Sequence, residues 1–304
     1  FKATKSSVPS SVASQMDKAI KKSVKLIKTH SITVPPKRKS GGFLTKIEPL
    51  EDYIEERREE FRDRSEYCDW VDDAYLLMGK AHYYKHDYSG AINALKILER
   101  SHKYSDLQPL GWLWQAKSYI EMGYYDDAKI NLDKLNKKEE LPRELEVEYH
   151  LALASLHINR ENYNKALTSL QGAVDNIRRG RSKARYHYLM AQIAERTGKS
   201  ATALDYYARV IEENPVYEMA FNAKINQALA YEGGRSSGTI REDLQDMIKD
   251  EKNKEYLGRI YYALANIAQQ EGDTEQALDF YKKAAGKSQS GSAQTGLIYL
   301  RLGD

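Results

Sequence analysis

The chain has 304 residues, a formal net charge of +3, 41% hydrophobic residues and 30% charged residues, a balance that is typical of proteins built from amphipathic helices. No run approaches the roughly 20 apolar residues that a membrane-spanning helix needs, so we expect the chain to lie outside the bilayer. The single cysteine, Cys68, excludes an internal disulfide and a cysteine-rich metal site.

The first predicted element is an amphipathic helix over residues 11–29. Its apolar side chains recur at helical spacing, and its lysines lie on the opposite face. The apolar face consists of Val12, Met16, Ile20, Val24 and Ile27. We predict that residues 1–32 form an N-terminal amphipathic helical segment, a partial unit of a repeat array.

Residues 33–69 form a predicted insertion that changes sign of charge along its length. A basic loop over 33–46 contains Pro-Pro and Gly-Gly, which break helices, and a helix over 48–66 carries nine acidic residues against four arginines. Residues 1–47 hold eleven Lys or Arg and one acid, a net charge of +10. Two solvated helix faces are the simpler interpretation; attraction between the blocks, or to two different partners, is the alternative.

Residues 70–304 repeat one template. A small residue stands twelve positions before a central alanine, and further core residues stand four and seven positions after it. Five copies are centred on Ala91, Ala128, Ala166, Ala203 and Ala277, which are 37, 38, 37 and 74 residues apart. Because 74 is twice 37, a degenerate copy is expected before the last one, at residues 218–250.

These offsets have a physical reason in a pair of antiparallel helices. Small residues twelve apart lie where the two backbones approach most closely, and a larger side chain there would cost roughly 1–3 kcal/mol. Glycines five residues before the alanine mark the turn, at Gly123, Gly198 and Gly272. The residues at offsets four and seven form a stripe that the next hairpin covers, so a stack is stable where one hairpin is marginal.

The template resembles the tetratricopeptide repeat, through Tyr75, Met78 and Gly79 in the first full copy and Asn214-Pro215 at the end of the fourth. The resemblance implies an all-α fold, a tetratricopeptide-like superhelical solenoid of antiparallel helix pairs. The period of 37–38 residues exceeds the usual length of about 34, so we expect longer turns. Residues 299–303 look like the start of a further repeat, which predicts a truncated last repeat and a parent protein that continues.

No catalytic or metal-binding pattern is evident, so no enzyme activity and no cofactor are predicted. Four histidines occupy positions that aromatic residues hold in other copies, and we predict that they pack in the core: His82, His150, His157 and His187. His82 and His86 have a helical zinc spacing but no third ligand. The Gly-Lys-Ser sequences at 198–200 and 286–288 lack the upstream glycine of a phosphate-binding loop.

Two binding modes are disfavoured by the sequence. The overall charge is balanced and no aromatic residues accompany the basic runs, which argues against nucleic acid as a partner. The carboxylate clamp of co-chaperones needs lysines and asparagines on three successive inner helices, whereas the first two full repeats offer Leu76, Lys80 and Trp114. A chaperone tail held by that clamp is therefore not expected.

The concave face formed by the first helices is the predicted protein-binding surface. Amides and phenols there suit hydrogen bonds to an extended peptide backbone; a simply solvated face is the alternative. The candidate residues are Arg185, Tyr188, Gln192, Asn222, Asn226, Arg259, Tyr262 and Asn266. Charge reversal at Arg185 and Arg259 is expected to weaken partner binding without lowering the melting temperature.

Two stretches are more specific than the repeat, KLIKTHSI at residues 25–32 and WVDDAYLLMGKAHYYKHDY at residues 70–88. With the charged insertion between them, they resemble the PorW/SprE family of type IX secretion and gliding-motility lipoproteins, most closely over residues 20–95. The resemblance implies a location on the periplasmic side of the outer membrane and a lipid anchor on a cysteine outside this chain. The implied partners are type IX secretion components that link the outer-membrane translocon to the periplasmic ring or motor.

The sequence therefore predicts a protein–protein interaction scaffold that is needed for secretion, gliding motility or both. The alternative is a peptide-binding tetratricopeptide adaptor or regulatory module in another complex. The chain opens with Phe1 and shows no signal peptide, so we expect it to start part-way through a longer precursor. A lipoprotein signal upstream would separate the two hypotheses.

Overall fold

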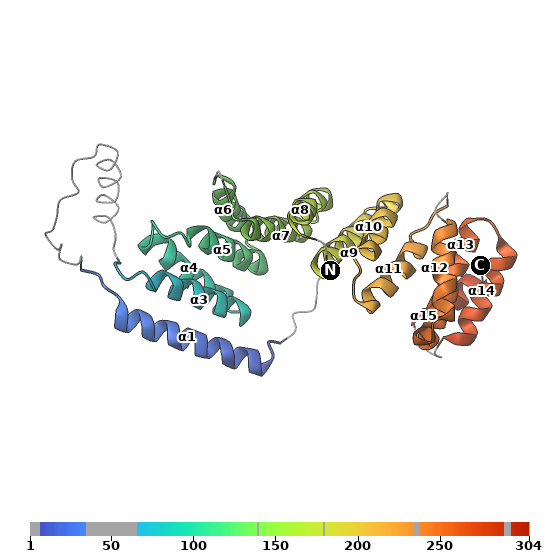
Figure 1. The fold of residues 1–304 in the computed structure, drawn as a ribbon, viewed down its shortest axis with the longest axis horizontal. Coiled ribbons are helices and arrows are strands. Elements are labelled where there is room, and N and C mark those ends of the chain that lie inside the picture. The colour runs from blue at the N-terminus through green and yellow to red at the C-terminus, as the bar shows by residue number, and fades with distance from the viewer. Residues whose placement is uncertain are drawn as a thin grey trace. The chain divides into compact units, whose positions relative to one another are not determined.

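The computed structural model describes residues 7–34, 66–138, 140–178, 180–233, 237–288 and 293–303. These described residues form helices and turns and no β-strand. They fall into two compact units, unit 1 (Phe1–Asn162) and unit 2 (Tyr163–Asp304). The predicted all-α fold of stacked helix pairs is confirmed (Figure 1). The boundaries at 1–32, 33–69 and 70–304 stay predictions, and most of the charged insertion, residues 35–65, lies outside the described residues.

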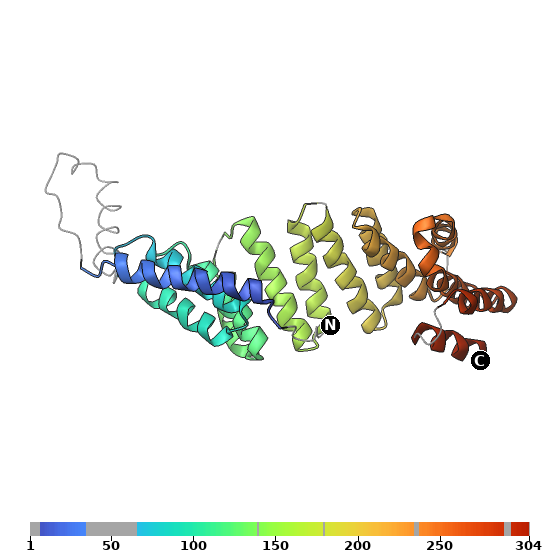
Figure 2. The same cartoon turned by 90° about the horizontal axis from the view of Figure 1, so that it is seen from below.

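Unit 1 begins with α1 (Ser10–His30), which packs along α3 (Figures 1 and 2). Two helix pairs follow, α3 with α4 and α5 with α6, and α7 packs against the second pair. The bounds are α3 (Val71–Tyr84), α4 (Tyr88–Ser101), α5 (Gln108–Met122), α6 (Tyr125–Asn136) and α7 (Arg143–Asn159). Within the described ranges no helix has the length and apolar character needed to cross a membrane.

Unit 2 continues the pattern with α9 paired to α10 and α13 paired to α14. Between these pairs lie α11 and α12, followed by a short 3₁₀ helix, η1. The bounds are α8 (Tyr163–Asn176), α9 (Arg181–Arg196), α10 (Ser200–Glu212), α11 (Tyr217–Leu229), α12 (Ser237–Lys249), η1 (Glu251–Tyr256), α13 (Leu257–Gln270), α14 (Thr274–Lys287) and α15 (Ala293–Gly303).

The template positions are buried in every full copy. All five central alanines are buried, with exposed fractions of 0–4%. The residues four and seven positions after each alanine are buried too, as are the small residues twelve before. At the first copy the close approach leaves no room for a side chain, since a Cβ on Gly79 would lie 2.6 Å from Leu95 Cδ2. The spacing found in the sequence is therefore the spacing of helix–helix contacts.

The degenerate copy at 218–250 keeps the template with an isoleucine in place of alanine. Ile240 is buried 37 residues after Ala203 and 37 before Ala277, and Ala228 stands buried twelve positions before it. The departure is η1, which the sequence does not predict. The buried Asn253 in η1 accepts a hydrogen bond from Tyr217 OH at 2.6 Å and donates one to the Met247 carbonyl at 2.9 Å.

The turn between the two helices of a copy has a left-handed residue five positions before the central alanine. Gly123, Gly198 and Gly272 have φ of 81°, 69° and 81°. The other two full copies use His86 and Glu161 at φ of 61° and 59°. The backbone geometry is thus the same in these copies while the residue is not, and the two non-glycine residues adopt a strained conformation.

Exchange of residues at this turn position should change stability in opposite directions within unit 1. We expect His86→Gly to raise the free energy of unfolding by about 0.5–1 kcal/mol, because glycine adopts positive φ without steric cost, and Gly123→Ala to lower it by about the same amount. Urea denaturation followed by circular dichroism measures both. A stabilising Gly123→Ala would contradict the explanation, since apart from its chain neighbours nothing lies within 4 Å of the position that the new Cβ would take.

The end of α1 is tied to the start of α3 by the buried carboxylate of Glu66. Its Oε1 atom accepts hydrogen bonds from the backbone N–H groups of Ile32, Tyr67 and Cys68, at 2.6, 3.1 and 3.0 Å, and its Oε2 atom accepts one from Ser31 Oγ. Burial alone raises the pKa of Glu66, but these hydrogen bonds outweigh burial and hold the pKa below its usual value. The carboxylate therefore stays ionised and joins residues 31–32 to residues 66–68.

Candidate protein-binding surface

The eight predicted site residues all lie in unit 2, on the first helices of successive copies (Figure 1). Helix α9 carries three of them, α11 two and α13 three. In this order they are Arg185, Tyr188 and Gln192; Asn222 and Asn226; and Arg259, Tyr262 and Asn266. Because α11 packs against α13, side chains at equivalent positions of these helices come within reach of one another.

Three hydrogen bonds connect these helices. The Asn226 amide donates to Tyr188 OH at 2.8 Å and links α11 to α9. The Arg259 guanidinium donates to Asn222 Oδ1 at 2.8 Å, and the Asn266 amide donates to the Ala228 carbonyl at 3.0 Å, so α13 is linked to α11 twice. Five of the eight residues thus form a ladder between copies. Of the other three, Arg185 is exposed, and Gln192 and Tyr262 are half-buried.

Tyrosine pairs pack beside this ladder. The ring of Tyr188 lies edge-on to Tyr207 at 5.5 Å, and Tyr207 OH donates to Glu195 at 3.0 Å. A similar pair recurs two copies later, where the ring of Tyr262 on α13 lies tilted to that of Tyr281 on α14 at 5.7 Å. Burial raises the pKa of the Tyr207 phenol, and the Glu195 carboxylate raises it further. The phenol therefore remains a hydrogen-bond donor and fixes the position of its neighbour.

The hydrogen bonds of the ladder change the effect on the melting temperature that we expect from charge reversal at Arg259, but not at Arg185. Arg259 bonds Asn222 and also lies over the ring of Phe221 at 5.1 Å. Its reversal should therefore lower the melting temperature as well as weaken a partner, which corrects the expectation for this residue. Arg185 is exposed, and the expectation of an unchanged melting temperature stays for it alone.

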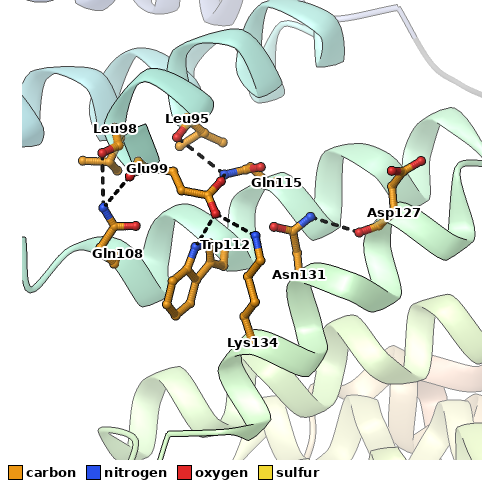
Figure 3. Close-up of polar contacts among 9 residues, drawn as sticks. All are labelled: Leu95, Leu98, Glu99, Gln108, Trp112, Gln115, Asp127, Asn131 and Lys134. Carbon is orange, nitrogen blue, oxygen red and sulfur yellow. Dashed lines mark hydrogen bonds and ion pairs between the residues drawn. The ribbon is translucent and has the colours of Figure 1, made fainter. Parts of the chain in front are cut away.

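Unit 1 contains a polar cluster that the sequence analysis missed (Figure 3). Glu99 on α4 accepts hydrogen bonds from Trp112 Nε1 and Gln115 Nε2 on α5, both at 3.1 Å, and from Lys134 Nζ on α6 at 2.6 Å. Burial alone would raise the pKa of Glu99, but these donors outweigh it and lower the pKa. The cluster joins one helix pair to the next, so its role in this structure is internal.

Of the four histidines predicted to pack in the core, His187 is buried, and His82, His150 and His157 are half-buried. His187 on α9 is 3% exposed and stacks on Tyr206 at 6.4 Å. His82 instead lies with Nδ1 2.7 Å from Asp87, whose side chain accepts from the Gly90 N–H at the start of α4. It supports a helix cap. In the described part of the chain, no three or more His, Cys, Asp or Glu side chains gather as metal ligands would.

The burial of His187 predicts an acid-sensitive unit 2. Within the described residues, neither ring nitrogen has a hydrogen-bond partner, and burial followed by the charge of Arg209 lowers the pKa of His187. The unfolded state then binds a proton more readily, so the stability contributed is present above the unfolded pKa of 6.5 and is lost as the pH falls toward the lower folded pKa. We expect His187→Tyr to reduce the loss of stability between about pH 7.5 and pH 5.5. Equal slopes of the unfolding free energy against pH in the wild type and in His187→Tyr would refute this prediction.

Comparison with known proteins places the repeats in a family of motifs. Residues 151–218 and 258–286 match tetratricopeptide-repeat family models. No curated protein sequence matches the chain. Among solved structures, the C-terminal part of a tetratricopeptide-repeat-containing protein from Cytophaga hutchinsonii superposes with a TM-score of 0.55 at 11% identity, over 94% of this chain and 98% of that one.

Two further structures are similar at lower TM-scores. A MamA protein reaches 0.42 at 18% identity, over 72% of this chain and 92% of its own. A tetratricopeptide-repeat protein from Parabacteroides merdae also reaches 0.42, at 12% identity, over 94% and 98%. The likeness to the Cytophaga protein supports the fold, and the family models identify the motif from which the fold is built.

Proposed function

We propose that this tetratricopeptide-repeat chain is a protein–protein interaction scaffold of the type IX secretion system, needed for secretion, gliding motility or both. The observation that carries the scaffold function is the array itself, since tetratricopeptide repeats expose successive first helices to partner proteins. The type IX assignment is supported by the resemblance at residues 25–32 and 70–88. These two stretches end α1 and form α3, which pack together and are joined through Glu66.

The location and partners follow from the same resemblance. The proposed location is the periplasmic side of the outer membrane, through a lipid anchor outside this chain. The proposed partners are components that link the outer-membrane translocon to the periplasmic ring or motor. Of the candidate surface residues, Arg185 on α9 is the one best suited to recognise such a partner, because its side chain is exposed and takes no part in the ladder.

Crosslinking in cells tests this function. The protein is tagged and crosslinked in cells, the membranes are fractionated, and the partners are identified by mass spectrometry. We expect type IX secretion components in the outer-membrane fraction, and fewer crosslinks with Arg185→Glu than with Lys165→Glu, an exposed charge on α8 used as the control. Partners confined to the cytoplasm would contradict the proposal and favour the adaptor alternative.

A further inference from the structure

In the five full copies an aromatic residue stands on the first helix, sixteen positions before the central alanine. These residues are Tyr75, Trp112, His150, His187 and Tyr261. In the fourth and last copies this ring meets a second ring, three positions after the alanine on the second helix. His187 stacks on Tyr206 at 6.4 Å, and Tyr261 stacks on Phe280 at 6.3 Å. The pair of rings in these copies fills space between the two helices.

The degenerate copy has no ring at this position. Lys224 stands sixteen positions before Ile240 and reaches Asp243, three positions after it, with Nζ 2.6 Å from Oδ1. A charged pair therefore replaces the two rings. Beside this pair, between α11 and α12, lies a cavity of about 320 Å³. We attribute this space to the missing ring and name it the α11–α12 cavity.

The α11–α12 cavity is largely apolar inside and has fixed sides. Phe221 on α11 and Met247 on α12 line it and are only 7% and 8% exposed. Asn253 connects the two sides, because it bonds Tyr217 OH on α11 and the Met247 carbonyl on α12. Small-molecule sites have volumes of about 300–1,000 Å³. The cavity lies at the lower end of this range, so its size suits one large side chain.

Three carboxylates at the rim of the cavity are particular to the degenerate copy. Asp243, Asp246 and Asp250 line the cavity and stand three, six and ten positions after Ile240. In the five full copies the equivalent positions hold a single acidic residue, Glu213. A requirement of the repeat fold would have placed carboxylates in the other copies too. The acidic rim therefore calls for an explanation specific to this cavity.

The chain itself neutralises these carboxylates only in part. Asp243 has its lysine partner. Asp246 is paired with Lys249, but the two side chains are 76% and 74% exposed, and water screens a pair of this kind. Asp250 accepts the backbone N–H of Lys252 at 3.0 Å, a hydrogen bond that leaves its negative charge in place. The rim thus carries an excess of negative charge that a cation entering the cavity would neutralise.

We propose that the α11–α12 cavity binds an arginine side chain of a partner protein. The methylene groups of this arginine contact Phe221 and Met247, and its guanidinium lies at the rim beside Asp246 and Asp250. A guanidinium is always charged and is less strongly hydrated than an ammonium, so it suits a partly apolar site better than lysine does. An aromatic ring in the same place would cover carboxylates without a counter-charge, which is costly. This inference rests on the proposed scaffold function and names one side chain that the scaffold holds.

The test uses N-acetyl-arginine amide as the probe and the methyl group of Met247 as the reporter. The full chain has six methionines, whose labelled methyl groups are resolved by NMR, and Met247→Leu identifies the signal from the cavity. We expect this signal to shift saturably, with a dissociation constant of about 1 mM. The signal of Met190, which is buried in α9, should not move. Absence of a saturable shift at Met247 would overturn the proposal.

Two other probes test the chemistry of the ligand. N-acetyl-glutamine amide is polar but uncharged and should bind at least about tenfold more weakly than the arginine probe. Equal affinity of these two would show that the carboxylates do not select the ligand. N-acetyl-phenylalanine amide should also bind more weakly, and tighter binding of this probe would assign the cavity to an aromatic ring of a partner. Either of these contrary results is incompatible with an arginine site.

A matched pair of variants separates the rim from the net charge of the chain. Asp246→Asn/Asp250→Asn should weaken binding of the arginine probe at least about fivefold, and asparagine at 250 can still cap η1. The control, Glu242→Gln/Glu251→Gln, removes two exposed carboxylates that do not line the cavity. It should change the affinity less than about twofold. Equal losses in the two double variants would mean that the rim has no specific role.

A third variant fills the cavity and links it to partner capture. Lys224→Tyr restores the ring that Tyr261 supplies in the last copy, so it should abolish binding of the arginine probe without lowering the melting temperature. A folded Lys224→Tyr that binds the probe as the wild type does would contradict the proposal. If this variant still captures the same partners by crosslinking in cells, the scaffold function stands and the role of the cavity is refuted. Loss of a partner together with loss of probe binding is the result expected.

Discussion

Replacing Gly79 by alanine is expected to lower the free energy of unfolding by about 1–3 kcal/mol, the usual cost of overpacking. The new Cβ would lie 2.6 Å from both Cγ and Cδ2 of Leu95, a side chain that is fully buried between α3 and α4. Leu95 has no solvent-exposed space into which to move, so the two helices must separate. Urea denaturation followed by circular dichroism measures the change.

The control is a glycine that lies in a helix without a close neighbour. Gly286 lies in α14, and apart from its chain neighbours and the backbone of its own helix nothing lies within 4 Å of the position that its Cβ would take. Gly286→Ala should raise the free energy of unfolding by about 0.5–1 kcal/mol, because alanine loses less backbone entropy on folding. If Gly79→Ala stabilised the protein as Gly286→Ala does, close approach of the two backbones could not be the reason for small residues at this offset.

The periodic part of the fold could be predicted because each copy meets the same packing constraint. The central alanines and their small partners are selected by backbone contact within one helix pair, so their spacing is visible in the sequence alone. Even Ile240 follows the spacing although it breaks the residue pattern. The 3₁₀ helix η1 is different, because it depends on Asn253 reaching Tyr217 across 36 residues. No local sequence pattern indicates that contact.

The sequence predicted on which helices the candidate residues lie, but not the hydrogen bonds that these residues make to neighbouring helices. Helical periodicity gives the face on which Tyr188, Asn226 and Arg259 lie. It does not give the distance to the next helix, and that distance decides whether an amide meets a partner protein or a neighbouring repeat. The cluster around Glu99 was missed for the same reason, since Glu99 and Lys134 are 35 residues apart.

Removing the carboxylate of Glu99 should destabilise unit 1 by about 2–4 kcal/mol, within the range for charged hydrogen bonds and partly buried ion pairs. In Glu99→Ala, the side-chain nitrogens of Trp112, Gln115 and Lys134 lose their shared acceptor (Figure 3). The control is Asp133→Ala on α6, which removes a carboxylate from an exposed pair with Lys129. An exposed pair contributes about 0.5 kcal/mol or less, so equal losses would contradict the assignment of Glu99 as a link between helix pairs.

The pH dependence of the Glu99→Ala effect provides a second measurement. Because the folded pKa of Glu99 is lowered, its contribution is fully present above the ordinary value of 4.5 and is lost as the pH falls through the folded pKa. The difference in unfolding free energy between the wild type and Glu99→Ala should therefore shrink from about pH 6 toward pH 3. A difference that is constant over this range would mean that the lost volume of the side chain, and not its charge, stabilises the junction of α4 with α5 and α6.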